Sequence, residues 1–265
     1  MPQTTPLRFY YDNMLGSTAG TLSATSTSAT ATFSIDNIHN FLEVNRWQAS
    51  SSATQNIDFD AGVGNTVQAD YLCILGHNLN SAGASLAVQV STSGAFAGEQ
   101  TTVSTSTPNA DTVHLVEFTN PSTAGFRYWR IPITGQTTAP SLAIVALGLK
   151  TTIAFIQPPF DPYADFTNAN VSLTEGGFVS GLHVKSIERQ IDINLPNSST
   201  SVYNTVKTWH DTHGFKNFFM NWNSTVNPED TFLVRPSVGF NNSINVDKFR
   251  NISFSLRGRR EVAST

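Results

Sequence analysis

The chain has 265 residues, which is long for one small sandwich and comfortable for two domains. Charged residues make up only 13% of it and the formal net charge is −4, so it lacks the basic face with which proteins hold the phosphates of DNA or RNA. Its abundant Ser, Thr, Asn and Ala favour a mainly β protein over a helical one with a charged surface. Direct binding of nucleic acid is therefore not expected.

Neither a disulfide nor a membrane span is expected. Cys73 is the only cysteine, and it lies inside the apolar run 71–75, where a buried and inert thiol is the natural state. The longest apolar run, residues 142–149, is too short to cross a bilayer, and the first residues do not form a basic segment followed by an apolar one. We expect a protein made in the cytoplasm without membrane insertion.

The first 32 residues are interpreted as an N-terminal arm or first strands. Residues 8–11 read as a short strand. Residues 17–32 are rich in Ser, Thr and Ala and have almost no large side chain. Composition leaves two forms open for this tract, a disordered segment or a flat extended arm.

Residues 33–152 carry the pattern of a β-sandwich. Ile57 and Phe59 alternate with polar residues, and residues 71–75 are apolar on both faces, which is typical of a central strand. A polar loop is predicted to run up to Pro108. Further short strands are predicted at 86–90, 113–118, 126–131 and 142–149. Short strands separated by turns predict two sheets packed face to face.

The order of motifs in this part of the chain resembles the galactose-binding-like jelly roll. The motifs are Trp47, Ile57-Asp-Phe-Asp60, Tyr71-Leu-Cys-Ile-Leu-Gly-His-Asn-Leu79, Leu86-Ala-Val-Gln-Val90 and Arg127-Tyr-Trp-Arg-Ile131. The resemblance implies that ligands sit in loops at one end of the sandwich. On that basis the candidate residues for binding a host-surface glycan are Trp47, His77, Asn78 and Trp129.

Three of these residues also have a structural interpretation. Alternation favours a core position for Trp129, and His77 with Asn78 can close a turn through backbone hydrogen bonds. Asp58 and Asp60 share the outward face of a strand, where a solvated face is favoured over a calcium site.

The remaining part of the chain is predicted to hold one helix among strands. Residues 153–166 are a proline-rich linker, since three prolines in six residues exclude a helix or a central strand. In residues 167–265 the predicted helix spans 201–213, between possible N-cap residues at 198–200 and Gly214, with Val206 and Trp209 on its apolar stripe. His210 and His213 could share a metal, but they lack a third ligand at a recognisable spacing, and histidines favoured by the helix C-terminus are the preferred interpretation.

Strands are expected on both sides of this helix. Ile187, Ile191, Ile193 and Leu195 share one phase of a two-residue period before it, and Ile252, Phe254 and Leu256 do so after it. One amphipathic helix among strands must lay its stripe on a sheet. The predicted fold is mainly β: an N-terminal jelly-roll sandwich and a C-terminal β-sandwich or barrel with one α-helix.

This second part resembles the tail-tube-like domain of distal tail proteins of tailed phages and of the lambda-type minor tail protein. The resemblance rests on the alternating strand, the helix, the motif His213-Gly-Phe-Lys-Asn-Phe-Phe219 and the late strand with an arginine-rich exit. It implies a homo-oligomeric ring, by resemblance a hexamer, around a channel for DNA, with the tail tube protein and a tail-tip hub protein as partners. In distal tail proteins this domain usually comes first, whereas here it comes second.

The arginine-rich exit consists of Arg257, Arg259 and Arg260, which are interpreted as an oligomer contact or as a solvated end. The sequence has no nucleophile elbow, phosphate-binding loop, dinucleotide fingerprint or pair of cysteine ligands. No enzymatic activity, metal or cofactor is expected. The main hypothesis is a structural virion protein at the tail tip of a phage, and the alternative is a carbohydrate-binding or adhesin-like protein.

Overall fold

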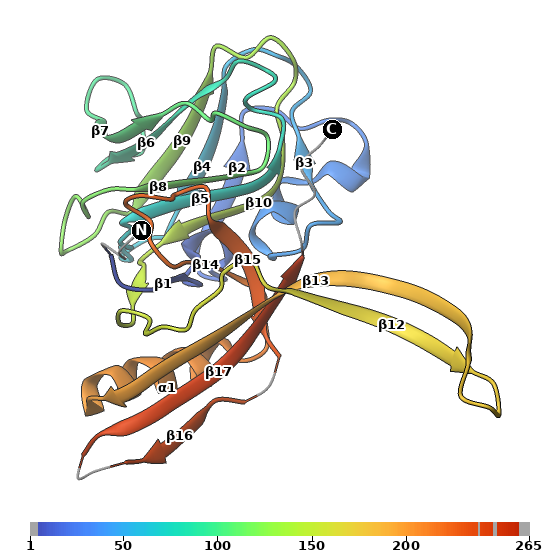
Figure 1. Cartoon of the computed structure of the whole chain (residues 1–265). Coiled ribbons are helices and arrows are strands. Elements are labelled where there is room, and N and C mark those ends of the chain that lie inside the picture. Colours follow the sequence, from blue (N-terminus) through green and yellow to red (C-terminus); the bar gives the residue numbers. More distant parts are fainter. Residues whose placement is uncertain (1–4, 238, 246–247, 260–265) are drawn as a thin grey trace. The chain divides into compact units, whose positions relative to one another are not determined.

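The computed structural model describes residues 5–237, 239–245 and 248–259 (Figure 1). They form antiparallel sheets, and within these ranges α1 is the one α-helix, so the predicted mainly β class is confirmed. The chain divides into two compact units. The sandwich unit is Arg8–Thr151 with Ser224–Thr231, and the arm unit is Thr152–Asn223 with the segments before Arg8 and after Thr231. No helix of the described part is long and apolar enough to cross a membrane.

Two antiparallel sheets face each other in the sandwich unit, with strand orders β3-β10-β5-β8 and β2-β4-β9-β6-β7. Their strands are β2 (Thr21–Ala24), β3 (Trp47–Gln48), β4 (Gln55–Asp60), β5 (Tyr71–His77), β6 (Ser85–Ser91), β7 (Thr101–Ser106), β8 (Val113–Glu117), β9 (Tyr128–Thr134) and β10 (Ser141–Gly148). The short strands β1 (Arg8–Tyr10) and β11 (Thr151–Thr152) and the 3₁₀ helices Met14–Gly16, Ala31–Phe33 and Ile35–His39 complete the described elements up to residue 152. This arrangement is consistent with a jelly roll.

The core of the sandwich unit lies between its two sheets. Every second residue of β4 is buried, and β10 is buried along its whole length, as expected for a half-exposed and a central strand. Trp47 and Trp129 are among its largest fully buried side chains. Inward alternation therefore sets which residues of each strand remain on the outer faces.

Two polar stretches form strands. β2 pairs with β4, with Leu22 opposite Phe59, so the Ser/Thr-rich tract is extended in part. The prediction of a polar loop up to Pro108 is wrong at β7, which pairs with β6. β7 is an edge strand with three threonines, and such a strand lacks the apolar alternation that reveals a buried one.

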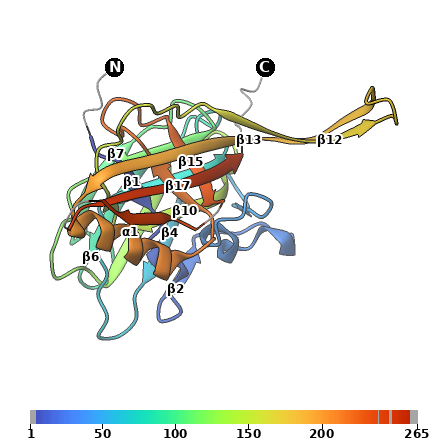
Figure 2. The ribbon, with the colours of Figure 1, turned by 60° about the horizontal axis from the view of Figure 1, so that its bottom comes forward.

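The arm unit contains one sheet and the helix. Its strands are β12 (Asp165–Leu173), β13 (Val179–Ser198), β14 (Phe218–Asn221), β15 (Thr231–Pro236), β16 (Asn241–Ile244) and β17 (Arg250–Arg259), and α1 spans Thr200–His213. Within this unit the strand order is β14-β15-β17-β13-β12, which belongs to an eight-stranded sheet whose order begins β11-β1-β14, and β16 also pairs with β17. Figure 2 shows α1 lying along β13 and β17.

The helix begins and ends for the predicted reasons. The Ser199 hydroxyl accepts a hydrogen bond from the Val202 amide, and Gly214 follows the helix with a φ of 63°. Val206 and Trp209 are fully buried. The Trp209 ring lies 5.3 Å from that of Phe218 and 5.4 Å from that of Phe254 on β17. The helix therefore covers one face of the sheet.

Candidate assembly surface

The most unusual feature of the arm unit is a long two-stranded ribbon, here called the arm. It consists of β12, the turn 174–178 and the first part of β13 up to Glu188, and it extends beyond the rest of its own sheet (Figure 1). The turn is closed by hydrogen bonds between Thr174 and Phe178, and Gly177 adopts a φ of 79°. Residues 171–187 are exposed throughout. Over residues 171–187, neither face of the arm is covered by any residue that the structure describes.

The two faces of the arm differ in chemistry. Directly opposed residues of antiparallel strands point to the same face. On one face the opposed pairs are Ala169–Val184, Val171–Leu182 and Leu173–Val179, with Ile187 opposite Thr167. On the other face they are Asn168–Ser186, Asn170–His183 and Ser172–Gly181. The arm thus has an apolar face and a polar face.

Two β-bulges gather the apolar side chains on one face. The apolar residues of β13 in the arm are Val179, Leu182, Val184 and Ile187, at spacings of three, two and three. Strict alternation would send neighbours at a spacing of three to opposite faces. The pairing shifts by one residue at two points, which leaves Ser180 and Lys185 without a direct partner on β12. Each extra residue restores the phase.

The apolar face of the arm continues a face that is covered nearer the helix. From Ile187 onward the register is regular, so Ile187 shares its face with Ile191, Ile193 and Leu195, and the pair Asp165–Arg189 lies between Ile187 and Ile191 on this face. The last three are at most 2% exposed beside α1, whereas Ile187 is 43% exposed. A helix of 14 residues is about 21 Å long and a strand of 20 residues is about 66 Å long, so α1 cannot cover all of β13.

The uncovered side chains of the arm are large. The exposed fractions are 54% for Val171, 60% for Leu173, 65% for Val179, 66% for Leu182 and 45% for Val184. They belong to successive opposed pairs on the same face of the ribbon, and they are therefore contiguous. Single exposed apolar residues are common on protein surfaces, whereas a contiguous apolar patch marks an interaction site.

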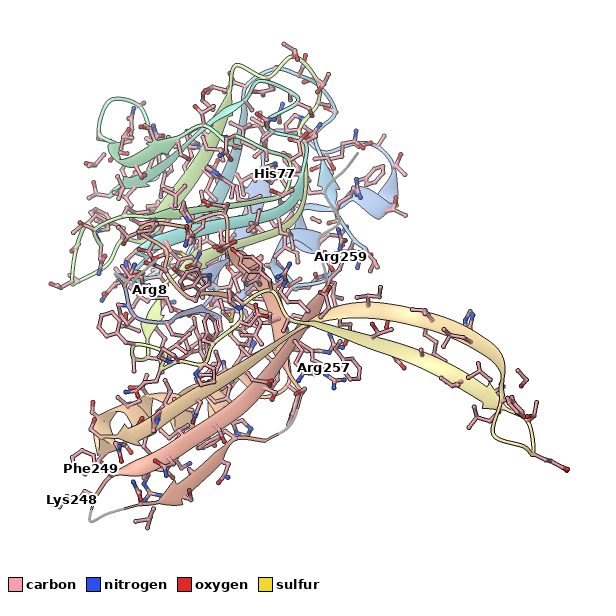
Figure 3. All side chains as sticks on the ribbon, in the orientation of Figure 1. Arg8, His77, Lys248, Phe249, Arg257 and Arg259 are labelled. Carbon is pink, nitrogen blue, oxygen red and sulfur yellow. The ribbon has the colours of Figure 1, made fainter. Side chains whose placement is uncertain are left out.

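The opposite face carries charge nearer the body of the sheet. Arg235 donates to Glu188 at 2.9 Å, and the guanidinium of Arg257 lies 3.7 Å from the ring centre of Phe166. Arg259 is exposed and lies opposite Glu188 (Figure 3). Arg257 and Arg259 therefore lie on the polar face of the sheet, and Arg260 lies outside the described residues. Their role as an oligomer contact stays a prediction.

Within the arm unit, two different strands are paired on one side only in the described part of the chain. β12 is the last strand in the order and pairs only with β13, and β16 pairs only with β17. The outer edge of each strand presents backbone N–H and C=O groups, as edge strands do. Such edges can accept another strand.

The four residues predicted to bind a glycan lie inside the sandwich unit and do not meet on an open surface. Trp47 and Trp129 are 0% and 1% exposed and belong to different sheets. The Trp47 indole donates to the Thr27 hydroxyl at 3.1 Å, and the Trp129 indole donates to the Phe126 carbonyl at 3.2 Å. A buried ring offers no face to a sugar.

His77 and Asn78 hold the turn after β5 through hydrogen bonds, which is the structural role that the sequence indicated. The Leu79 amide donates to Nδ1 of His77 at 3.2 Å, and Asn78 bridges the Ala139 carbonyl and the Ser141 amide. Burial lowers the pKa of His77 to about 4. His77 also lies opposite Leu142, whose other neighbour is Trp47. The ligand-binding role of the four residues stays a prediction.

The remaining candidates for metal binding are engaged with the protein. Arg130 and Arg127 each donate two hydrogen bonds, to Asp58 and Asp60 respectively, at 2.6–2.9 Å. His213 lies within hydrogen-bond distance of two backbone carbonyls after the helix. In the described ranges no group of three or more His, Cys, Asp or Glu residues could hold a metal ion.

No protein-family model matches the sequence, and no curated protein matches it. Among solved structures, chitosan-binding module 1 of a chitosanase/glucanase from Paenibacillus sp. IK-5 is 21% identical, with a TM-score of 0.41, over 51% of this chain and 97% of that one. A CBM32 module from Clostridium perfringens, in complex with GalNAc-β-1,3-galactose, is 11% identical, with a TM-score of 0.40, over 49% and 95%.

A GH29 fucosidase from Ruminococcus gnavus is 14% identical, with a TM-score of 0.43, over 54% of this chain and 28% of the fucosidase. These similar structures thus include carbohydrate-binding modules and a glycosidase.

Proposed function

We propose that this chain is a structural subunit that assembles with further copies of itself through the arm, as a ring-forming component at the tail tip of a tailed phage. The observation that carries the proposal is the contiguous apolar face of the arm, which lies on the same side of the sheet as the residues under α1, beyond the pair Asp165–Arg189, and which none of the described residues covers. The tail location rests on the resemblance of residues 167–265 to tail-tube-like domains.

The physical reason for assembly is the cost of leaving this face in water. Burying one large aliphatic side chain contributes roughly 1.5–3 kcal/mol, and the arm presents several together. An isolated two-stranded hairpin is also marginally stable by itself. A second copy that packs against the arm would both bury the apolar side chains and hold the ribbon in shape.

The free edges of the sheet favour a ring over a two-fold dimer. β12 and β16 differ in length and sequence, so a contact that joins the β12 edge of one copy to the β16 edge of the next uses two different surfaces. Such head-to-tail contacts close into rings when the rotation between copies permits it. A hexamer between the tail tube protein and a tail-tip hub protein is the arrangement that the resemblance implies.

A matched pair of double variants tests this proposal. Val171→Asp with Leu182→Asp places two charges on the apolar face. Asn170→Asp with His183→Asp changes the neighbouring opposed pair and places two charges on the polar face. We expect mass photometry and negative-stain microscopy to show closed assemblies for the wild type and the polar-face variant, and monomers for the apolar-face variant. A wild type that stays monomeric at high concentration, or two variants with equal effects, would contradict assembly through the arm.

Recognition of a glycan by the sandwich unit is the second candidate function. The observation that favours it is a groove of about 450 Å³ on the outer face of the sheet β2-β4-β9-β6-β7, whose lining combines apolar side chains with several hydroxyl groups. A phage tail component that also binds a surface glycan would combine both candidates. A glycan array with the full-length chain is the first test, and an array without hits would remove this candidate.

A further inference from the structure

The groove on the sandwich unit lies across three neighbouring strands. It is formed by the outer faces of β6, β7 and β9 and has a volume of about 450 Å³, within the range of about 300–1,000 Å³ typical of ligand sites. Its lining residues are Ser85, Leu86, Ala87, Gln89, Thr105, Ser106, Thr107, Pro132 and Thr134. None of them carries a charge.

The outward-facing residues of the groove form an apolar floor with a polar rim. Ala87 and Pro132 point outward by the alternation of β6 and β9, and Ala87 lies opposite Thr105. Around this floor stand the hydroxyls of Ser85, Thr105, Thr107 and Thr134 and the amide of Gln89. A hydroxyl can both donate and accept a hydrogen bond. A sugar ring has the complementary pattern, with an apolar face of C–H groups and hydroxyls around its edge.

Several rim groups are already oriented by hydrogen bonds. The Ser85 and Thr107 hydroxyls lie 3.1 Å apart, and the Gln89 amide donates to the Thr102 hydroxyl at 3.3 Å. Side chains held in this way lose less conformational freedom when a ligand binds. These bonds leave further donor and acceptor positions on the same groups.

The arginine beside the groove is paired with a carboxylate. Arg130 lies opposite Gln89 on β9 and donates to both oxygens of Asp58, at 2.6 and 2.9 Å, while its guanidinium lies 4.0 Å from the centre of the Phe96 ring. A paired guanidinium attracts an anion weakly. The site therefore favours an uncharged ligand over a phosphate or an acidic sugar.

A second, smaller cavity adjoins the groove and lengthens it. It has a volume of about 170 Å³ and shares Thr107 with the larger one. Nε2 of His114 on its wall lies 2.9 Å from the hydroxyl of Ser106, which lines the groove. Burial lowers the pKa of His114, so this imidazole is uncharged at neutral pH and offers one donor and one acceptor. Asn109 and Glu229 also line this cavity.

We infer that the groove and the adjoining cavity form one extended site for an uncharged oligosaccharide of more than one sugar unit. Its floor is Ala87 and Pro132, and its hydrogen-bonding groups come from β6, β7, β9 and His114. This inference rests on the second candidate function. It places the site on a sheet face and not at the buried residues Trp47, His77 and Trp129.

The test uses the full-length chain and defined probes. Neutral hexasaccharides of glucose, galactose and N-acetylglucosamine are titrated calorimetrically, with hexagalacturonate as the charged comparison. Ala87→Trp fills the floor, and Thr105→Val with Thr134→Val removes two hydroxyls from exposed positions. Thr21→Val, at the far edge of the same sheet, is the matched control. Thermal unfolding curves that match the wild type establish that each variant is folded.

We expect at least one neutral probe to bind the wild type and Thr21→Val equally, and hexagalacturonate to bind less well. Ala87→Trp should abolish binding, and each lost hydroxyl should weaken it about five-fold. Binding that survives in Ala87→Trp would overturn the location of the site while glycan recognition stands. Failure of every neutral probe to bind the wild type would overturn both.

Discussion

At the residue scale, one buried and uncharged histidine, His77, closes the turn after β5. The His77 side chain, labelled in Figure 3, has no solvent exposure, and Asp111 approaches its Nδ1 at 3.8 Å. The pKa of His77 is lowered to about 4, mainly by burial and also by the neighbouring His114, while Asp111 acts in the opposite direction. An unfolded histidine has a pKa near 6.5. Protons therefore bind the unfolded chain more readily than the folded one between these two values.

Stability should fall as the pH drops from 6.5 towards 4, because only the unfolded state gains the proton of His77 in this window. His77→Asn keeps an acceptor near the Leu79 amide and cannot gain that proton. Its loss of unfolding free energy between pH 7 and pH 4.5, measured by urea denaturation, should be about 2 kcal/mol smaller than that of the wild type. His183→Asn, at an exposed site, is the control. An equal loss in His77→Asn and the wild type would show that His77 does not set this dependence.

The tryptophans show how far single residues could be understood from the sequence. Alternation along β9 predicted a core position for Trp129, and the ring is buried. The pairs Asp58–Arg130 and Asp60–Arg127 could not be predicted, because pairing depends on the register between β4 and β9. The groove could not be predicted either, because small and polar residues on a strand face look the same in the sequence whether or not the face is concave.

At the scale of elements, the arm is the central feature, and a specific prediction follows from its two β-bulges. Deleting Lys185 removes an extra residue and leaves Val184 and Ile187 on the same face of a regular strand. Deleting His183, two residues away, brings Val184 and Leu182 next to each other and sends Leu182 to the polar face. We expect the first deletion to preserve assembly and the second to abolish it, as measured by light scattering coupled to gel filtration. Equal behaviour of the two deletions would contradict the role of the apolar face.

The helix and the arm differ in how well the sequence predicts them. The caps and stripe of α1 are local signals, and the predicted residues 201–213 differ from the observed helix by one residue. The shared phase of Ile187, Ile191, Ile193 and Leu195 was also visible in the sequence. The sequence did not reveal that α1 covers three of these residues and leaves Ile187 exposed, because burial depends on where the helix lies along the strand.

At the scale of the whole molecule, the proposed interaction is between the arm of one copy of the chain and a neighbouring copy. Among the described residues, the apolar side chains of the sandwich core and of the sheet beneath α1 are buried, whereas those on the apolar face of the arm are exposed to water. No pattern within one sequence reveals what covers such a face, so the resemblance to tail-tube-like domains and the geometry of the arm must be tested together. The central claim is that a second copy of the chain covers the arm.

Hydrogen–deuterium exchange measured over a wide range of protein concentration tests this claim most directly. If a neighbouring copy packs on the arm and adds a strand to the free edge of β12, amides of residues 165–188 should exchange more slowly as the concentration and the measured mass rise together. Amides of α1 should change little. Exchange in residues 165–188 that stays fast while the mass rises, or a mass that remains that of one chain, would contradict the claim.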